Sequence, residues 1–304
     1  MSLRPDPSVI SNISTPDFAR LPDPHRLFAT RAARLRKLAE GARLAPYLNF
    51  LADLCEIQAQ LVTDLPAPPP VDADTVARNR SYRMPPLDRA ELVGSAALSE
   101  TVGALLERAS KIEMPDQARA ALRALRDAPE QDRRALLSDI ASDRVPEGFA
   151  APAAFLAAAL QLLAVRMAAG LDAEQLVPIR VGICPSCGGR PSVSMVTATL
   201  HTEGARYCCC ATCATQWNEV RVKCTCCGST KGIGYRAVDD GAASDQPIKA
   251  EICKECKSWV KILYQNVDTT LEPFADDVAS LGLDALMRET EWDRGGFNPF
   301  LIGY

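Results

Sequence analysis

The chain has 304 residues, enough for about two domains, and its net charge of −4 excludes a nucleic-acid-binding surface spread over the whole protein. Hydrophobic residues make up 47% of it, as in ordinary water-soluble proteins. The first twenty residues contain three prolines and several polar residues where an export signal requires an apolar run. We therefore expect a cytoplasmic protein whose thiols stay reduced.

Apolar residues at spacings of three and four positions predict helices up to about residue 176. Pro24 and Asp88 stand where helices are expected to begin. Residues 151–170 are long enough to span a membrane, but they are mostly alanine and include Gln161 and Arg166, so we expect a core helix and no membrane insertion. The predicted helical segments are residues 27–61, 90–112, 118–125, 130–140 and 152–169.

A proline-rich connection, residues 63–87, separates the first two helical blocks. It holds six prolines and three arginines, so we predict a long loop, either functional or a merely solvated charged stretch. At its end, Met84-Pro85-Pro86-Leu87 lies between two arginines, and no helical pattern is available to bury it. The residues predicted to bind a partner are Arg83, Met84, Leu87 and Arg89.

Four Cys-x-x-Cys pairs lie within 73 residues of the second half. Two intervening residues let both thiolates of one turn face a single ion, and two such turns complete a tetrahedral shell. Disulfides are the alternative, which a chain with reduced thiols disfavours. Four thiolates suit zinc and iron alike, so the spacing does not identify the metal. The pairs are Cys184/Cys187, Cys210/Cys213, Cys224/Cys227 and Cys253/Cys256.

The pairs form a tandem repeat, because corresponding pairs are offset by 40 and 43 residues. The first pair of each unit is followed by a glycine that allows positive φ, and the second by a tryptophan, Trp217 or Trp259, which we expect to pack beside the site. Modules this small depend on their metal for folding. We assign one ion to Cys184, Cys187, Cys210 and Cys213, and the other to Cys224, Cys227, Cys253 and Cys256.

Short alternating runs predict strands between and after the cysteine turns. Residues 193–200 with 205–207, and 233–238 with 248–252, are expected to form the hairpins that return the second pair to the first. The fold class is therefore α+β. Its expected parts are a helical domain over 1–176, a first four-cysteine ribbon module over 177–223, a second over 224–266, and a C-terminal helix and tail over 267–304.

Three further thiols, Cys208, Cys209 and Cys226, lie inside or beside the ligand turns. They are either reactive thiols activated by nearby cations or small buried hydrophobic residues, and we favour the second. Cys226 competes with Cys227 as a ligand, but only Cys227 has the two-residue gap and the following glycine. Cys55 lies in a helical apolar pattern and is expected in the core.

No catalytic motif stands out. Neither histidine has a nucleophile or ligand partner at motif spacing, and no phosphate-binding glycine loop is present. Residues 180–261 carry eleven Lys and Arg against seven Asp and Glu, and two divalent four-thiolate sites offset that excess of +4. We therefore expect no nucleic-acid binding. Cations such as Arg206 and Arg221 either stabilise the thiolates or form a solvated strand face.

Taken together, the motifs from about residue 177 onward closely resemble the formate dehydrogenase accessory protein family, FdhE, whereas the helical half matches it only in size, helical character and the basic segment near residues 83–89. The motifs are Cys184-Pro185-x-Cys187-Gly188, Arg206-Tyr207 before Cys210-x-x-Cys213, Trp217, Val220-Arg221-Val222-Lys223-Cys224-x-x-Cys227, Glu251-x-Cys253-x-x-Cys256, Lys261-Ile262-Leu263-Tyr264, Asp276-Asp277-Val278-Ala279-Ser280-Leu281 and Asn298-Pro299-Phe300.

The resemblance implies a cytoplasmic, non-enzymatic maturation factor that binds the molybdenum- or tungsten-pterin catalytic subunit of a respiratory formate dehydrogenase before export. It also implies rubredoxin-like sites with two iron ions per chain, zinc being the alternative. A rubredoxin-type electron carrier and a nucleic-acid-binding zinc ribbon are the competing functions. A helix over about 276–287 and the Asn298-Pro299-Phe300 tail are expected to clamp the helical half to the ribbons. The oligomeric state, a homodimer included, stays open.

Overall fold

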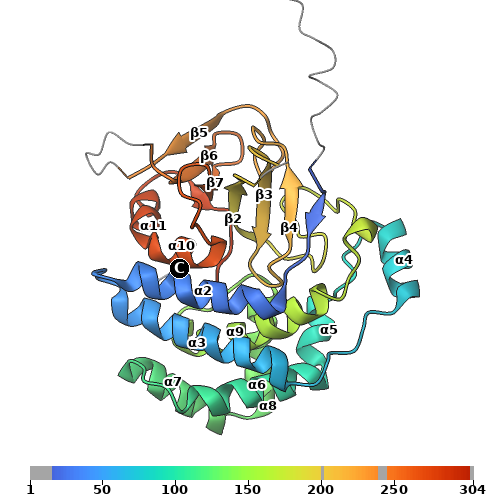
Figure 1. Cartoon of the computed structure of the whole chain (residues 1–304), viewed down its shortest axis with the longest axis vertical. Helices are drawn as coiled ribbons and strands as arrows, with labels where there is room; N and C mark the ends of the chain where they lie inside the picture. The colour runs from blue at the N-terminus through green and yellow to red at the C-terminus, as the bar shows by residue number, and fades with distance from the viewer. Residues whose placement is uncertain (1–15, 200–201, 239–244, 302–304) are drawn as a thin grey trace, which may run out of the picture.

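In the computed structural model, which describes residues 16–199, 202–238 and 245–301, a layer of helices supports one mixed sheet (Figure 1). The α+β class expected from the sequence is confirmed. The helices between residues 24 and 175 are α2 (Pro24–Ala39), α3 (Ala45–Asp64), α4 (Ala73–Ser81), α5 (Arg89–Gly94), α6 (Ala96–Ala109), α7 (Asp116–Asp127), α8 (Glu130–Ala141), α9 (Ala150–Ala168) and the 3₁₀ turn η1 (Ala173–Gln175).

Two of the predicted helical blocks are divided. The block over 27–61 breaks into α2 and α3 at Gly41, whose φ of 71° ends the first helix. The block over 90–112 breaks at Ser95, which ends α5 and caps α6 by accepting a hydrogen bond from the Leu98 N–H. Asp23 and Asp88 cap α2 and α5, so the predicted starts near Pro24 and Asp88 are confirmed.

The connection over 63–87 is not a continuous loop, because it contains the helix α4. Asp72 accepts hydrogen bonds from the N–H and hydroxyl groups of Thr75, and Arg78 and Arg80 lie in the last turn, where cations complement the helix dipole. The proline content concealed this cap. None of the residues of α4 is buried, so the helix stands on the surface.

Helix α9 forms the centre of the helical layer. It is the one helix among the described residues whose length and composition would allow it to cross a membrane, and 72% of its apolar window is buried inside the protein. Its alanines let neighbouring helices approach closely, and Phe155 makes an edge-to-face contact with Phe50 of α3. Gln161 donates a hydrogen bond to the Ala211 carbonyl at 2.6 Å, which ties α9 to the cysteine-rich half. Cys55 is buried in this core, as predicted.

The two predicted hairpins form, but they belong to one sheet and not to separate modules. Its order is β1-β4-β3-β2-β7-β6-β5, with β8 paired to β7. The join is the parallel pair β2–β7, in which Val193 lies opposite Lys261. The strands are β1 (Ala19–Arg20), β2 (Pro191–Val196), β3 (Arg206–Cys210), β4 (Gln216–Glu219), β5 (Ile233–Arg236), β6 (Ile248–Cys253), β7 (Ser258–Tyr264) and β8 (Asp293–Arg294).

Both ends of the chain join this arrangement. Strand β1, from the N-terminal part, pairs with β4, so a strand of the sheet comes from the segment expected to be only helical. The single helix predicted over 276–287 is two helices, α10 (Pro273–Ala279) and α11 (Leu281–Arg288), separated at Ser280, whose hydroxyl donates to the Asp276 carbonyl.

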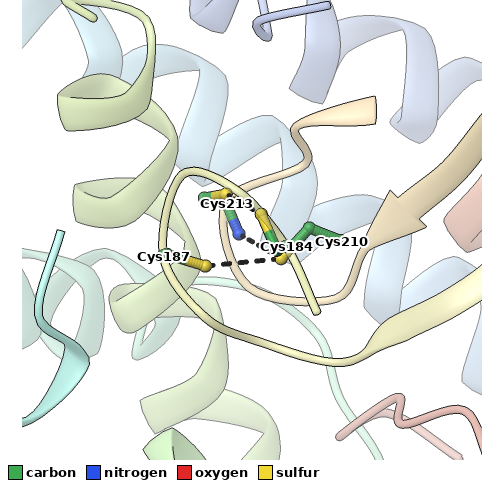
Figure 2. A group of neighbouring side chains, drawn as sticks. All are labelled: Cys184, Cys187, Cys210 and Cys213. Atoms are coloured by element: carbon green, nitrogen blue, oxygen red, sulfur yellow. Dashed lines mark hydrogen bonds between the residues drawn. The ribbon is translucent and has the colours of Figure 1, made fainter. Parts of the chain in front are cut away.

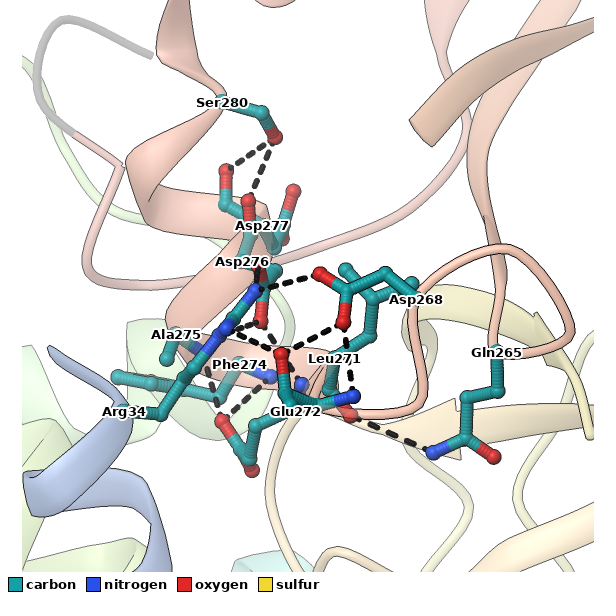
Figure 3. Close-up of polar contacts among 11 residues, drawn as sticks. Arg34, Gln265, Asp268, Leu271, Glu272, Phe274, Ala275, Asp276, Asp277 and Ser280 are labelled. Atoms are coloured by element: carbon teal, nitrogen blue, oxygen red, sulfur yellow. Dashed lines mark hydrogen bonds and ion pairs between the residues drawn. The ribbon is translucent and has the colours of Figure 1, made fainter. Parts of the chain in front are cut away.

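Helix α10 fastens the helical layer to the sheet, because it packs against both α2 and β2. Arg34 of α2 makes two hydrogen bonds to the Asp276 carboxylate, at 2.7 and 2.9 Å, and one to Asp268 at 3.2 Å (Figure 3). In the tail, Phe300 packs edge-to-face on Phe274, and its carbonyl accepts a hydrogen bond from the Tyr47 hydroxyl at 2.6 Å. These contacts hold the two layers as one body.

Candidate metal centres

The first centre brings together Cys184, Cys187, Cys210 and Cys213, with every pair of sulfur atoms within 4.8 Å (Figure 2). The Sγ atoms of Cys184 and Cys213 are 3.6 Å apart, and those of Cys187 and Cys210 are 3.5 Å apart. A tetrahedral ion with metal–sulfur bonds of about 2.3 Å requires sulfur separations of about 3.8 Å. The four thiols therefore fit one four-thiolate metal ion.

Backbone hydrogen bonds shape the first turn. The Gly188 N–H donates to the Cys184 carbonyl, and the Cys184 N–H donates to the Gly189 carbonyl, both at 2.9 Å. Gly188 has φ of 73°, as expected for the glycine after the second cysteine. In the opposite turn, the Cys213 N–H points at the Cys210 sulfur at 3.5 Å, and the next residue, Ala214, also has positive φ, which the sequence did not indicate.

All four thiols of the first centre are buried in the core that α9 occupies. Burial raises the pKa of the Cys184 thiol well above its ordinary value. In the thiolate form, four negative charges cannot share a dry site without a cation. A buried group of four cysteines therefore suits a bound metal ion. Trp217 is buried beside the centre as a packing residue, as predicted.

The segment predicted to dock a partner lies against this first centre. The Leu87 N–H donates to the Ser186 carbonyl at 3.0 Å, and the Leu87 side chain is only 2% exposed. Arg89 holds Asp143 with two hydrogen bonds, at 2.6 and 3.2 Å, and donates to the Gly188 carbonyl at 3.3 Å.

The exposure that we expected of Leu87 and Arg89 is therefore wrong, because the first cysteine turn supplies the packing surface that the helical pattern did not reveal. The Arg89 side chain is 13% exposed and holds the turn through its hydrogen bond to the Gly188 carbonyl. Arg83 and Met84 do remain on the surface, and Met84 is 54% exposed. The segment thus has a buried end and an exposed end.

The second centre repeats the geometry of the first. Its sulfurs also lie within 4.8 Å of one another, with Cys224 3.7 Å from Cys256 and Cys227 3.8 Å from Cys253. Gly228 has φ of 79°, and its N–H donates to the Cys224 carbonyl at 2.9 Å. These distances fit a second four-thiolate ion.

The two centres differ in their exposure. In the second centre, Cys227 is exposed and Cys256 is half-buried, whereas the first centre has no exposed ligand. The second turn lies near the free edge strand β5, since Cys253 pairs with Ile233 of that strand. Trp259, which is buried on the neighbouring strand β7, packs as predicted.

The extra thiols lie outside both groups of four. Cys208 and Cys209 are buried in β3, and burial raises the pKa of both thiols, that of Cys208 to about 12, which favours packed, protonated thiols over reactive thiolates. Cys226 is half-buried beside Gly295, while Cys227 and not Cys226 joins the second group.

A buried ion pair connects the two centres. The sequence had suggested that Arg206 stabilises the thiolates or lies on a solvated strand face, and neither role anticipated this pair. Arg206 of β3 is almost fully buried and pairs with Glu251 of β6 at 2.8 Å. The same guanidinium donates to the Lys223 carbonyl at 2.9 Å, directly before the second cysteine turn. Arg206 therefore fixes the start of the second centre against the strand that leads to the first.

The difference in exposure leads to a prediction about metal release. In zinc-loaded protein, a chelator should remove one equivalent at least about tenfold faster than the other, because access to the thiolates limits exchange. The release is followed with a zinc-sensitive dye. The Cys227→Ser variant should lack the fast phase and keep the slow one. If both ions left the wild-type protein at the same rate, the assignment of one buried and one exposed centre would be contradicted.

Three family models match the chain in succession: FdhE N-terminal over residues 16–181, FdhE central domain over 183–221 and FdhE C-terminal domain over 222–301. The chain belongs to the FdhE family. It is 51% identical over 302 residues to the protein FdhE homolog of Rhizobium meliloti (strain 1021), covering 99% of this chain and 98% of that relative.

Other FdhE proteins share the sequence and the fold. The FdhE homolog of Pseudomonas putida (strain KT2440) is 39% identical over 277 residues, covering 89% of this chain and 85% of the relative. The crystal structure of the FdhE protein from Pseudomonas aeruginosa superposes with a TM-score of 0.84 at 33% identity, covering 94% of this chain and 99% of that one. The resemblance seen in the cysteine motifs therefore extends over the helical half.

Proposed function

We propose that this protein is a cytoplasmic, non-enzymatic maturation factor that binds the molybdenum- or tungsten-pterin catalytic subunit of a respiratory formate dehydrogenase before export. The observation that carries the proposal is full-length membership of the FdhE family with both four-cysteine groups intact. The two layers pack on one another around one sheet, which would hold both centres in fixed positions relative to a docked subunit.

We also propose that the eight paired cysteines form two four-thiolate sites, each of which binds one iron ion, with zinc as the alternative occupant. The ligands would be Cys184, Cys187, Cys210 and Cys213 in the first site, and Cys224, Cys227, Cys253 and Cys256 in the second. A bound ion would supply cross-linking of the turns and, if it is iron, one-electron chemistry. Elemental analysis of anaerobically purified protein tests this proposal, and less than one equivalent of iron plus zinc would contradict it.

The exposed end of the proline segment is the proposed contact for the catalytic subunit. Tyr82 is 74% exposed and Met84 54%, and Arg83 lies between them on the surface next to the first centre. An exposed aromatic, an exposed methionine and a cation form the kind of anchor that protein interfaces use.

The Arg83→Glu/Met84→Ala variant should bind a formate dehydrogenase catalytic subunit about tenfold more weakly, because it removes the apolar anchor and reverses the charge. Titration at fixed salt measures the affinity. Metal content and melting temperature should not change, since neither side chain is buried.

The matched control for this variant is Arg123→Glu on α7, another exposed arginine, which should bind as the wild type does. Arg89→Glu is unsuitable as a binding test, because it breaks the buried pair with Asp143 and would destabilise the protein. Unchanged affinity of the double variant would place recognition elsewhere, most directly on the exposed Val220 and Val222 between the centres.

An electron carrier is the second candidate, and the exposed Cys227 is the observation that favours it, because electron exchange requires a centre near the surface. The large helical layer is a feature that a simple carrier does not need. A reversible one-electron titration of iron-loaded protein, absent in Cys227→Ser, would support this function.

A further inference from the structure

A cavity of about 540 Å³ lies next to both metal centres. Its walls are residues 180–183, which lead into the first cysteine turn, Thr225 and Cys226 of the second turn, and Ser258 and Gly295 at the β7–β8 pair. The volume lies within the range of pockets that hold small molecules. Neither centre uses this space.

Two glycines allow the walls of the cavity to meet. A Cβ atom on Gly182, which has φ of 69°, would lie 2.2 Å from the Thr225 carbonyl oxygen, and a Cβ atom on Gly295 would lie 2.2 Å from the Cys226 sulfur. A side chain at position 182 would force the two backbone segments apart, and one at position 295 would displace the Cys226 side chain. One wall of the cavity is therefore set by the close approach of Gly182 to the Thr225 backbone, and another by the packing of Gly295 against the Cys226 side chain.

Three arginines line the cavity, and two of them lack an acidic partner. Arg294 pairs with Asp277 at 2.8 Å and also with Asp284, in a buried cluster that Lys261 completes. Arg180 and Arg190 are exposed, and neither guanidinium has an ion pair in the part of the chain that the structure describes. The nearby Asp143 carboxylate is already bound to Arg89. Two cations without an acidic partner thus line one hollow in a chain of net charge −4.

We propose that this arginine cavity, lined by Arg180, Arg190 and Arg294, binds a compact phosphate-bearing small molecule. Guanidinium groups match phosphate oxygens with paired hydrogen bonds, so unpaired arginines beside a preformed hollow favour this anion class. The apolar part of the lining is aliphatic and consists of Val181, Ile183 and Pro191. The arginines would therefore recognise the ligand through its phosphate group. An adjoining hollow of about 200 Å³ shares Arg190 and Arg294 and offers room for the rest of an ester.

This ligand goes beyond the proposed function, because a small anion can bind whether or not the protein serves a formate dehydrogenase. Inorganic phosphate and ADP are titrated separately into the zinc-loaded full chain by calorimetry at constant ionic strength. At least one should bind with a Kd below about 1 mM. The Arg180→Ala/Arg190→Ala variant should bind it about tenfold more weakly or worse, because each substitution removes a charge-assisted hydrogen-bonding group.

The control is Arg26→Ala/Arg123→Ala, which removes two exposed positive charges from α2 and α7 and should bind as the wild type does. Zinc content and melting temperature should match the wild type in both double variants. Equal binding of phosphate and ADP indicates an anion site alone, and tighter binding of ADP indicates that the ester also enters; both support the cavity. No binding of either probe, or an equal loss in the control, would overturn the proposal.

Discussion

Cys184→Ser should lose one metal ion and, with it, most of the folding stability of the protein. Its centre lies in the core that also contains α9, so emptying the centre leaves a buried polar cluster with no cation between the layers. Metal binding at such sites supplies a large part of the folding free energy, so we expect a loss on the order of 5 kcal/mol, comparable to the net stability of a domain. Urea unfolding under reducing conditions measures it.

Cys227→Ser is the matched comparison, because it also removes one ligand but from the exposed centre. It should lose one ion, keep the other and stay folded. Cys208→Ala, a buried thiol outside both groups, should keep two ions and lose only packing energy. If Cys184→Ser retained two ions, or if Cys227→Ser unfolded to the same extent, the division into a buried structural centre and an exposed centre would be wrong.

Asp277→Ala should destabilise the protein by about 3–5 kcal/mol, the usual consequence of removing one partner from a buried charge cluster. Asp277 is fully buried and pairs with Lys261 at 3.0 Å and Arg294 at 2.8 Å. It also accepts a hydrogen bond from Asn298 at 2.9 Å. Asp284 pairs with the same two cations, so the variant leaves two buried positive charges with one carboxylate.

The control for this variant is Asp245→Ala, which breaks an exposed pair with Lys249 and should cost less than about 1 kcal/mol. Thermal and urea unfolding of the metal-loaded proteins give the comparison. An Asp277→Ala variant as stable as the control would show that the cluster contributes nothing to the junction of α10, β7 and β8.

Acid should weaken the same cluster. Burial alone would raise the pKa of Asp277, but Arg294 and Lys261 outweigh it, so the pKa lies below its ordinary value. A carboxylate with a lowered pKa contributes stability above the pKa of its unfolded form, about 3.9, and that contribution is lost as the pH falls further. The difference in stability between the wild type and Asp277→Ala should therefore shrink below about pH 4.

The helical half could be predicted from sequence in kind but not in its breaks. Periodicity identifies apolar faces, but it does not reveal that Gly41 ends α2 or that the Ser95 hydroxyl caps a new helix. Each break depends on one local hydrogen bond or one positive φ. Helix α4 was missed for the same reason. Its start depends on the Asp72 cap, which the surrounding prolines concealed.

The sequence by itself determined the two groups of four cysteines, their glycine turns and the flanking hairpins, because each turn is shaped by hydrogen bonds among residues a few positions apart. Only the tertiary structure decided which centre is buried, how β2 and β7 join the two hairpins, and that Leu87 and Arg89 face inward. Those properties depend on contacts between segments that are far apart in the sequence. Arg89 and Gly188, for example, are 99 residues apart. Local spacing encodes ligand geometry, whereas burial follows from how distant segments pack.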